Sequence, residues 1–219
     1  MPGNILLSTA YFGPIRYFSK FLMPGKVILE KGENYIKQTY RNRCRIYGPN
    51  GVVTLSVPVK RGSFHKTALR DLEIDHEKTW YPVHWKTIQA SYQASPFFEY
   101  YADDLHPLIS SKIKFLWDLN LEITDTLLKL LEIPRDYTVS SDYLDDMDNP
   151  NNLDYRQSIH PKHPSRDPWF QSVPYHQVFE DRHGFIPDLS ILDLLFNMGP
   201  DTVDVLRQSL NHSEAGRPL

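Results

Sequence analysis

Three arginines stand at alternate positions in one short segment of the chain. Arg41, Arg43 and Arg45 share one face of an extended strand, and the residues between them share the other. Guanidinium groups about 7 Å apart repel one another unless negative charge lies against them. Because a guanidinium fork can bind two oxygens of one phosphate or carboxylate, the spacing predicts a phosphate-binding strand. The alternative is a solvated face paired with the chain's own carboxylates.

Three neighbouring residues extend or qualify this candidate site. Asn42 lies within the arginine segment, and Lys60 follows the returning strand of a predicted hairpin, so both are assigned to the phosphate site. Cys44 stands between two arginines, which could lower its pKa and make its thiol reactive. The favoured interpretation is a small buried side chain that faces away from the charges.

A second group of candidate residues lies on a predicted helix between Trp80 and Tyr92. His84 and Tyr92 share a helical face, and His84 is the candidate general base because imidazole exchanges protons near neutral pH. Trp85, Lys86 and Tyr92 are assigned to ligand binding. The competing interpretation is a hydrogen-bonded histidine among core aromatic residues.

The opening turn supplies the remaining candidates. Tyr11, Arg16 and Tyr17 surround the expected start of a helix, whose free amide groups attract anions. A lone Gly13 makes the match to a phosphate loop poor. His160 and His163 have the spacing of half a zinc site, but no cysteine partner follows them, so we predict no metal and no cofactor.

The elements that would position these residues are those of an α/β fold. Residues 5–7 predict a buried strand, which a turn and a helix over 15–22 follow, and 27–30 predict a second strand. A hairpin is expected from 36–46 and 52–59 around a Gly-Pro-Asn-Gly turn, with a further strand over 69–74. We therefore expect a mixed sheet with an N-terminal strand–turn–helix and a β-hairpin.

Helices are expected in the middle and at the carboxyl end. Apolar periodicity predicts helices over 80–92, 97–105, 112–131, 189–196 and 202–210. The segment 138–174 is polar and aperiodic, which is typical of a long loop that closes over a site. Residues 1–211 are expected to form one domain and 212–219 a frayed tail.

Composition narrows the classes of function. A formal charge of −3 and a pI near 6.3 argue against a nucleic-acid-coating protein. One cysteine permits no intrachain disulfide, and no signal segment or membrane span is recognisable, which favours the cytoplasm. The sequence does not indicate an oligomeric state.

Several segments, in order along most of the chain, together resemble the WbqC-like protein family of bacteria. The matching segments are Tyr11–Phe18, Tyr40–Ile46, Leu55–Val59, His84–Trp85 with Tyr92, Ser95–Phe98, Asp118–Asn120, Ser140–Asp142 and Phe185–Asn197. The chain departs from the family pattern at Ser8–Ala10, where many members have Gln-Pro, and in a shorter region over 148–174. The resemblance implies a cytoplasmic role near nucleotide-sugar or amino-sugar processing.

Two functions remain open from the sequence. The first is a transferase in surface-polysaccharide or O-antigen assembly that acts on a nucleotide-activated sugar or an acyl donor. Its arginines and Lys60 would bind the donor phosphates, and Tyr11, Tyr17 and Trp85 would stack on a sugar or base. The second is a binding or assembly protein that docks an acidic partner through the same arginine face.

Overall fold

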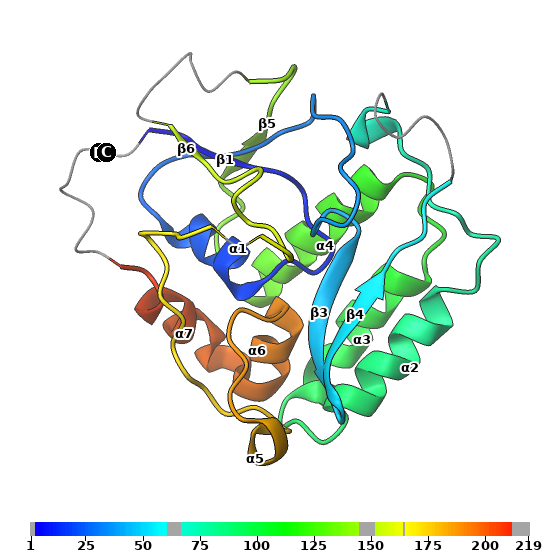
Figure 1. The fold of residues 1–219 in the computed structure, drawn as a ribbon, viewed down its shortest axis with the longest axis vertical. Helices are drawn as coiled ribbons and strands as arrows, with labels where there is room; N and C mark the ends of the chain where they lie inside the picture. The colour runs from blue at the N-terminus through cyan, green and yellow to red at the C-terminus, as the bar shows by residue number, and fades with distance from the viewer. Residues whose placement is uncertain (1–2, 61–66, 145–151, 164, 212–219) are drawn as a thin grey trace.

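The computed structural model describes residues 3–60, 67–144, 152–163 and 165–211. The polar loop expected over 61–66 and the frayed tail expected over 212–219 lie outside these residues. The described chain contains both helices and strands, including a parallel sheet and an antiparallel hairpin, which confirms the predicted α/β class (Figure 1). No helix in the described part of the chain is long and apolar enough to cross a bilayer.

The larger of the two sheets in the described chain is a four-stranded parallel sheet. Its strands are β1 (Ile5–Leu7), β2 (Val27–Leu29), β5 (Tyr137–Val139) and β6 (Leu153–Asp154), in the spatial order β5-β2-β1-β6. All three side chains of β1 are buried, as expected for an inner strand covered on both faces. The carboxyl ends of the four strands therefore meet along one edge of the sheet.

The predicted strand–turn–helix opens the chain. After β1 the backbone turns at Pro14 into α1 (Ile15–Ser19), which continues as a 3-10 turn over Lys20–Leu22. Pro14 lies just before the first helical residue, where its missing N–H leaves no helical hydrogen bond unmade. This short crossover brings the chain back to β2, parallel to β1.

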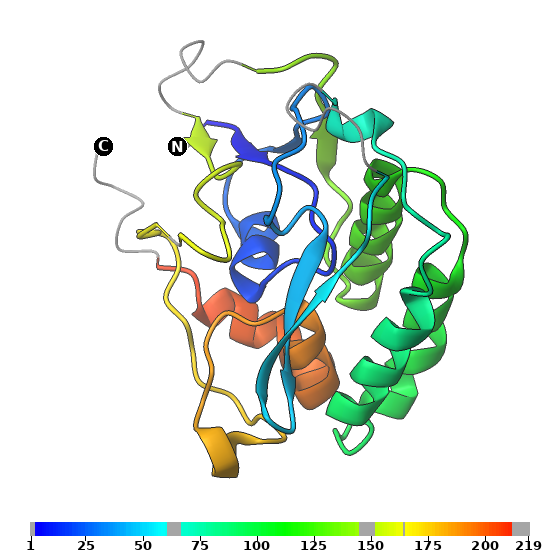
Figure 2. The ribbon, with the colours of Figure 1, turned by 45° about the vertical axis from the view of Figure 1, so that its right-hand side comes forward.

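The predicted hairpin forms a sheet of its own. β3 (Arg43–Gly48) and β4 (Gly51–Ser56) pair in antiparallel register and stand in front of the helices (Figure 2). β3 begins at Arg43, seven residues later than the predicted start at 36. The strand expected over 69–74 is instead a 3-10 turn, Leu69–Asp71, followed by isolated bridges.

Helices pack on both sides of the hairpin. α2 (Tyr81–Tyr92), α3 (Phe98–Ser110) and α4 (Leu116–Leu130) form one group, which confirms three predicted helices. The other group contains α5 (Glu180–His183), α6 (Ile191–Met198) and α7 (Thr202–Gln208), which lie on the opposite side of β3 in Figure 1. Buried residues from both groups belong to one hydrophobic cluster.

The polar segment over 138–174 differs from the expected loop. It completes β5 and provides β6, so it supplies both edge strands of the parallel sheet. A strand is recognised in a sequence by its alternation of apolar and polar residues, and strands of two or three residues are too short to show it. Their positions are set by the strands with which they pair. Part of this segment, residues 145–151, lies outside the described residues.

We predict that replacing Gly199, which joins α6 to α7, destabilises the folded protein. Its φ is +54°, and a Cβ atom there would lie 2.5 Å from the Phe97 ring. Gly199→Ala should lower the free energy of unfolding by about 2–4 kcal/mol, measured by urea denaturation.

Gly184 provides the matched control for that variant. It also has a positive φ, +73°, but an added Cβ would meet nothing within 4 Å. Gly184→Ala should cost about 1 kcal/mol, from backbone strain alone. Equal losses for the two variants would contradict the role assigned to the Phe97 contact.

Candidate functional site

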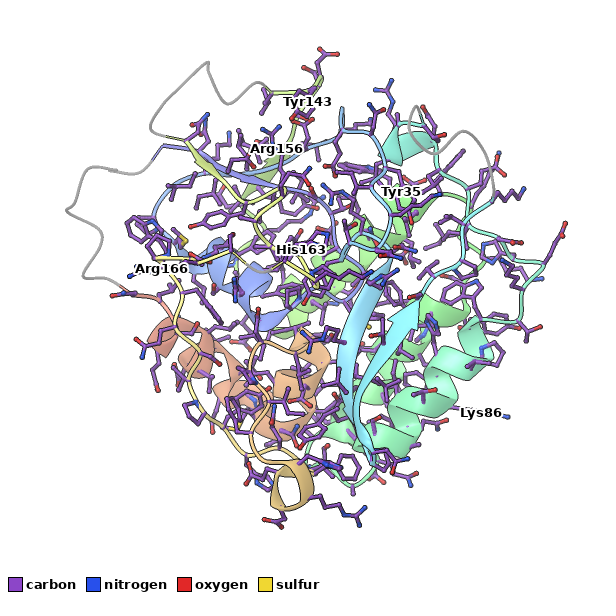
Figure 3. The ribbon with its side chains drawn as sticks, viewed as in Figure 1. Tyr35, Lys86, Tyr143, Arg156, His163 and Arg166 are labelled. Atoms are coloured by element: carbon purple, nitrogen blue, oxygen red, sulfur yellow. The ribbon has the colours of Figure 1, made fainter. Side chains whose placement is uncertain are left out.

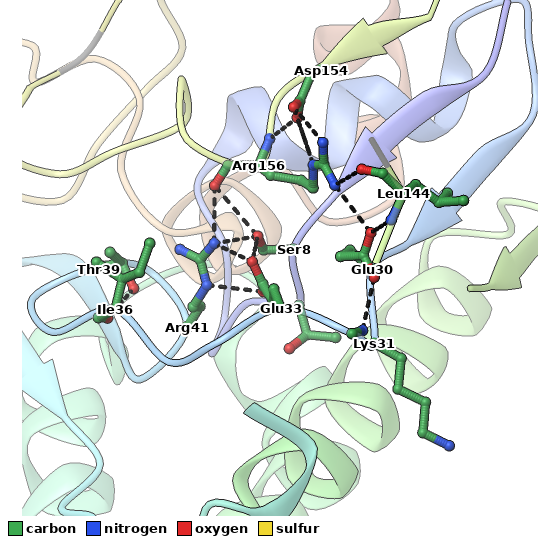
Figure 4. Close-up of polar contacts among 12 residues, drawn as sticks. Ser8, Glu30, Lys31, Glu33, Ile36, Thr39, Arg41, Leu144, Asp154 and Arg156 are labelled. Carbon is green, nitrogen blue, oxygen red and sulfur yellow. Dashed lines mark hydrogen bonds and ion pairs between the residues drawn. The ribbon is translucent and has the colours of Figure 1, made fainter. Parts of the chain in front are cut away.

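Polar residues stand within two residues of the carboxyl end of each of the four parallel strands. Ser8 follows β1, Glu30 follows β2, Ser140 follows β5 and Arg156 comes two residues after β6. Ser140 Oγ donates to Glu30 Oε1 at 2.7 Å, and Arg156 Nη1 donates to Glu30 Oε2 at 3.0 Å. Ser8 Oγ lies 3.3 Å from the backbone oxygen of Arg156. Hydrogen bonds therefore link the strand ends across the sheet edge (Figure 4).

Arg41 belongs to this buried network. Its Nε donates to Glu33 Oε1 at 2.9 Å, its Nη2 donates to Ser8 Oγ at 2.6 Å, and only 3% of its surface is exposed. Ser8 Oγ in turn donates to Glu33 Oε2 at 2.9 Å. The charge of Arg41 is therefore neutralised by a carboxylate of the same chain, which is the alternative that the sequence left open for this arginine.

The strand order creates a switch point between β1 and β6. The chain leaves β1 toward β2 on one side and returns to its other side only at β6. In open parallel sheets, ligands bind outside the carboxyl ends of strands at such a point. Here the structure has a hollow of about 10 Å³ beside Ser8, Tyr17, Arg41 and Tyr155, which has room for about one water molecule.

A larger cavity adjoins this hollow and shares Tyr40 and Ile159 with it. We call it the arginine cavity, and its volume is about 230 Å³. It is lined by Arg16, Tyr40, Arg45, Ile159, His160, Pro161, Ile186, Pro187 and Asp188. Two predicted phosphate ligands, Arg16 from α1 and Arg45 from β3, thus meet at one cavity.

Asp188 is the carboxylate of the arginine cavity. Arg16 Nε lies 3.1 Å from Asp188 Oδ2, and the Arg16 backbone N–H donates to Oδ1 at 2.9 Å. Burial raises the pKa of Asp188 to about 6, although the nearby Arg16 and Arg45 act in the opposite direction. Asp188 therefore exchanges its proton much closer to neutral pH than an exposed aspartate does.

His160 offers a hydrogen-bond donor to the same cavity. Its Nδ1 accepts hydrogen bonds from the backbone N–H groups of Lys162 and His163, at 3.1 and 3.2 Å. Burial lowers the pKa of His160, and nearby positive charges, including those of Arg41 and Arg43, lower it further. The neutral ring must then carry its proton on Nε2, so its free nitrogen is a donor.

Tyr11 and His84 are brought together, but inside the core. The Tyr11 hydroxyl lies 2.9 Å from His84 Nδ1, and Trp80 packs edge-on against the imidazole. Burial lowers the pKa of His84 to about 4, while a hydrogen bond with the Ser56 backbone acts in the opposite direction. His84 is 5% exposed and is not among the residues that line the arginine cavity.

Tyr92 and Asn42 hold elements of the core together. The Tyr92 hydroxyl donates to Asp193 Oδ1 at 2.8 Å and accepts from the Tyr47 backbone N–H at 3.0 Å. It therefore ties α2 to α6 and β3. Asn42 Nδ2 donates to the Val57 backbone oxygen at 2.9 Å. Both side chains are buried.

The other candidates occupy separate places. Lys60 is exposed and pairs with Glu73 at 2.6 Å, away from the arginine cavity lining. Trp85 and Lys86 line a different hollow between α2 and α3. Arg43 begins β3, and within the described residues its buried Nε makes no hydrogen bond.

The interpretation of Cys44 as a structural residue agrees with its position. Its side chain is fully buried on the face of β3 opposite Arg43 and Arg45, which are both partly exposed. Burial raises the pKa of the thiol, so the neutral form is favoured. The neighbouring guanidinium groups do not reach across the strand to activate it.

Sequence reasoning missed three residues of the arginine cavity. Tyr40 and Asp188 stand within segments that carry the family resemblance, but residues 188–190 were expected only to cap the following helix. In the structure Ser190 is the cap, since its side chain accepts from the Leu192 N–H. The φ of +52° at Asp188 frees its carboxylate to meet Arg16. His160 was considered only as a metal ligand.

Fold and site together define an α/β protein whose cavity lies beside the carboxyl edge of a parallel sheet. The chain belongs to the WbqC-like protein family, which matches it over residues 9–163. The uncharacterized protein Rv1507c of Mycobacterium tuberculosis is 27% identical over 217 residues, a match that covers 87% of this chain and 91% of that protein. No solved structure gives a significant match.

We predict that the Arg41–Glu33 pair stabilises the strand ends only as a pair. Arg41→Met should lower the free energy of unfolding by about 3–5 kcal/mol, because it leaves a carboxylate buried without its partner. The double variant Arg41→Met/Glu33→Leu should recover much of the loss in urea denaturation. Lys60→Met, which breaks an exposed pair, should leave the midpoint nearly unchanged.

We also predict a pH-dependent contribution from His84. Because its folded pKa is lowered to about 4, the stability it contributes is complete above the unfolded pKa, near 6.5, and is lost as pH falls through 4. The loss over this window should be about 3 kcal/mol. His84→Gln should remove that component of the pH profile measured by urea denaturation. An unchanged profile would show that His84 titrates as an exposed histidine.

Proposed function

We propose that this protein binds a phosphorylated small molecule in the arginine cavity, as the activated donor of a group transfer. The donor would be a nucleotide-activated sugar or an acyl donor. One observation carries the proposal: Arg16 and Arg45, which lie on different elements, converge on one cavity with His160. Guanidinium groups in fixed positions suit phosphate oxygens, which they can bind through paired hydrogen bonds.

The charge balance of the arginine cavity supports an anionic ligand. Its lining contains two guanidinium groups and one carboxylate, so a net positive charge remains after Arg16 pairs with Asp188. His160 adds a neutral donor, and Arg43 and Lys162 lie near enough to lower its pKa. A phosphate group would offset this positive field in a site partly shielded from water.

The volume of the cavity suggests how a donor would sit. About 230 Å³ is less than the roughly 300–1,000 Å³ typical of whole-ligand pockets, so the cavity suits the phosphate end of a donor. The remainder of a nucleotide or acyl carrier would extend past the rim. Tyr40 lines both the arginine cavity and the small hollow beside Ser8, and it gives the rim an aromatic ring.

Asp188 is the residue best placed to act as general base. Its carboxylate would take the proton of an acceptor hydroxyl as the acceptor oxygen bonds to the donor carbon. With a nucleotide sugar, the bond from that carbon to the phosphate oxygen would break, and Arg16 and Arg45 would stabilise the charge on the leaving phosphate. With an acyl-coenzyme A, the carbon–sulfur bond would break and the thiolate would leave, while the two arginines would hold the phosphates of the carrier. A pKa of about 6 is close to the value that favours proton transfer near neutral pH.

Membership of the WbqC-like family supports the proposal that the donor is an activated sugar. The WbqC-like name is linked with O-antigen and surface-polysaccharide genes, where activated sugars are the ordinary donors. The competing proposal, an acidic protein docked on a flat arginine face, has less support. Arg41 is buried against Glu33, and Arg45 faces a cavity, so the three arginines do not form one continuous surface.

Isothermal titration with UDP-, dTDP- and CMP-sugars and with acyl-coenzyme A tests the proposal. We expect one of these classes to bind, and Arg45→Met to weaken its affinity about 10- to 100-fold through the loss of a charge-assisted hydrogen bond. Lys60→Met is the matched control, because it removes an exposed cation that lies outside the cavity lining. Asp188→Asn should keep the affinity and abolish transfer.

Two results would contradict the proposed function. The first is that none of these phosphorylated compounds binds the full-length protein. The second is that Arg45→Met and Lys60→Met weaken binding equally, since a general charge effect would then explain it. In either case the arginine cavity would lose its assigned role.

A further inference from the structure

One aromatic candidate is left without a role by the arginine cavity. Tyr11 and Tyr17 are buried in the core, but Trp85 is only partly buried. Trp85 lines a hollow of about 170 Å³ between α2 and α3. Figure 3 shows Lys86, its neighbour in this hollow, on the side of the molecule away from His163 and Arg166.

The indole of Trp85 packs against two neighbouring rings. The His106 ring lies 4.7 Å from it, and the Phe98 ring lies 6.1 Å from it, both measured between centroids. Tyr81, one helical turn earlier, adds a second aromatic ring to the wall. The wall of the hollow therefore contains aromatic rings. Because the Trp85 indole already packs against His106 and Phe98, it needs little further ordering when a ligand binds.

The rest of the lining combines the apolar Pro82 and Ile109 with three polar side chains. Lys86 and Gln89 are exposed on α2, and Ser110 ends α3 on the other side of the hollow. These side chains can donate hydrogen bonds, and Gln89 and Ser110 can also accept them. The positive charge of Lys86 disfavours a cationic ligand, which an aromatic wall alone would accept.

The geometry points to a binding site for a single sugar ring. A pyranose has an apolar C–H face that can lie on an aromatic ring, and hydroxyl groups at its edge that need hydrogen-bonding partners. The hollow is well below the size of a whole drug-like ligand, so it fits one ring and not a nucleotide. This inference is independent of the proposed function, because no residue is common to the linings of the two sites.

Saturation-transfer NMR with methyl glycosides of neutral hexoses, an N-acetylhexosamine and a hexuronic acid tests this inference. We expect at least one glycoside to bind the full-length protein, with a dissociation constant on the order of 1 mM. Trp85→Ala should weaken that binding at least about tenfold. Gln89→Ala, at an exposed helix position where folding is not at risk, should weaken it by a smaller factor.

The control is Tyr100→Ala, which removes an aromatic ring that is 74% exposed and lies outside this hollow. It should leave glycoside binding unchanged. The inference is overturned if no glycoside binds, if Gln89→Ala and Tyr100→Ala are equally silent, or if phenol and indole bind in place of glycosides. The last outcome would indicate a site for an apolar group in place of a sugar ring.

Discussion

The structure depends on the burial of opposite charges at the carboxyl edge of its parallel sheet. Glu30 and Glu33 follow β2. Arg156 reaches Glu30 from 126 residues along the chain, and Arg41 turns back to Glu33 from eight residues further on. A buried charge without a partner is costly, so each loop must place its charge where the other loop supplies the opposite one. The pair with Glu33 neutralises Arg41, one of the three clustered arginines. Arg45 takes no part in these pairs and lines the arginine cavity.

A second constraint joins the two ends of the chain beside that edge. The Ser190 N–H donates to the Arg45 backbone oxygen, and the Ser190 hydroxyl donates to the Phe12 backbone oxygen. Pro14 and Ser190 form an antiparallel bridge, which sets Arg16 next to Asp188. The arginine cavity is thus assembled from α1, Tyr40 and β3, the segment after β6 that carries His160, and the segment before α6, and no single element of the fold contains it.

Local pattern explains what the sequence could predict. The apolar run of β1, the Gly-Pro-Asn-Gly turn of the hairpin and the periodic faces of α2 to α4 are properties of neighbouring residues. The neighbours of the arginines in the structure cannot be found from such local patterns, because Glu33, Asp188 and His160 come close to them only through tertiary contacts. The pattern singled out Arg16 and Arg45, which the structure brings to one cavity, but chemical type alone could not distinguish them from Arg41 or from the interior His84.

The pairing of β1 has a kinetic consequence for the chain as it is made. The Leu6 oxygen accepts from the Tyr155 N–H, and the Ile15 N–H donates to the Leu189 oxygen, so the first strand and helix are completed by late residues. Contacts of such long sequence separation form slowly, and an inner parallel strand stays exposed until they do. On the ribosome, the amino-terminal segment must therefore wait for nearly the whole polypeptide to emerge, which makes chaperone protection of its apolar residues most valuable during synthesis.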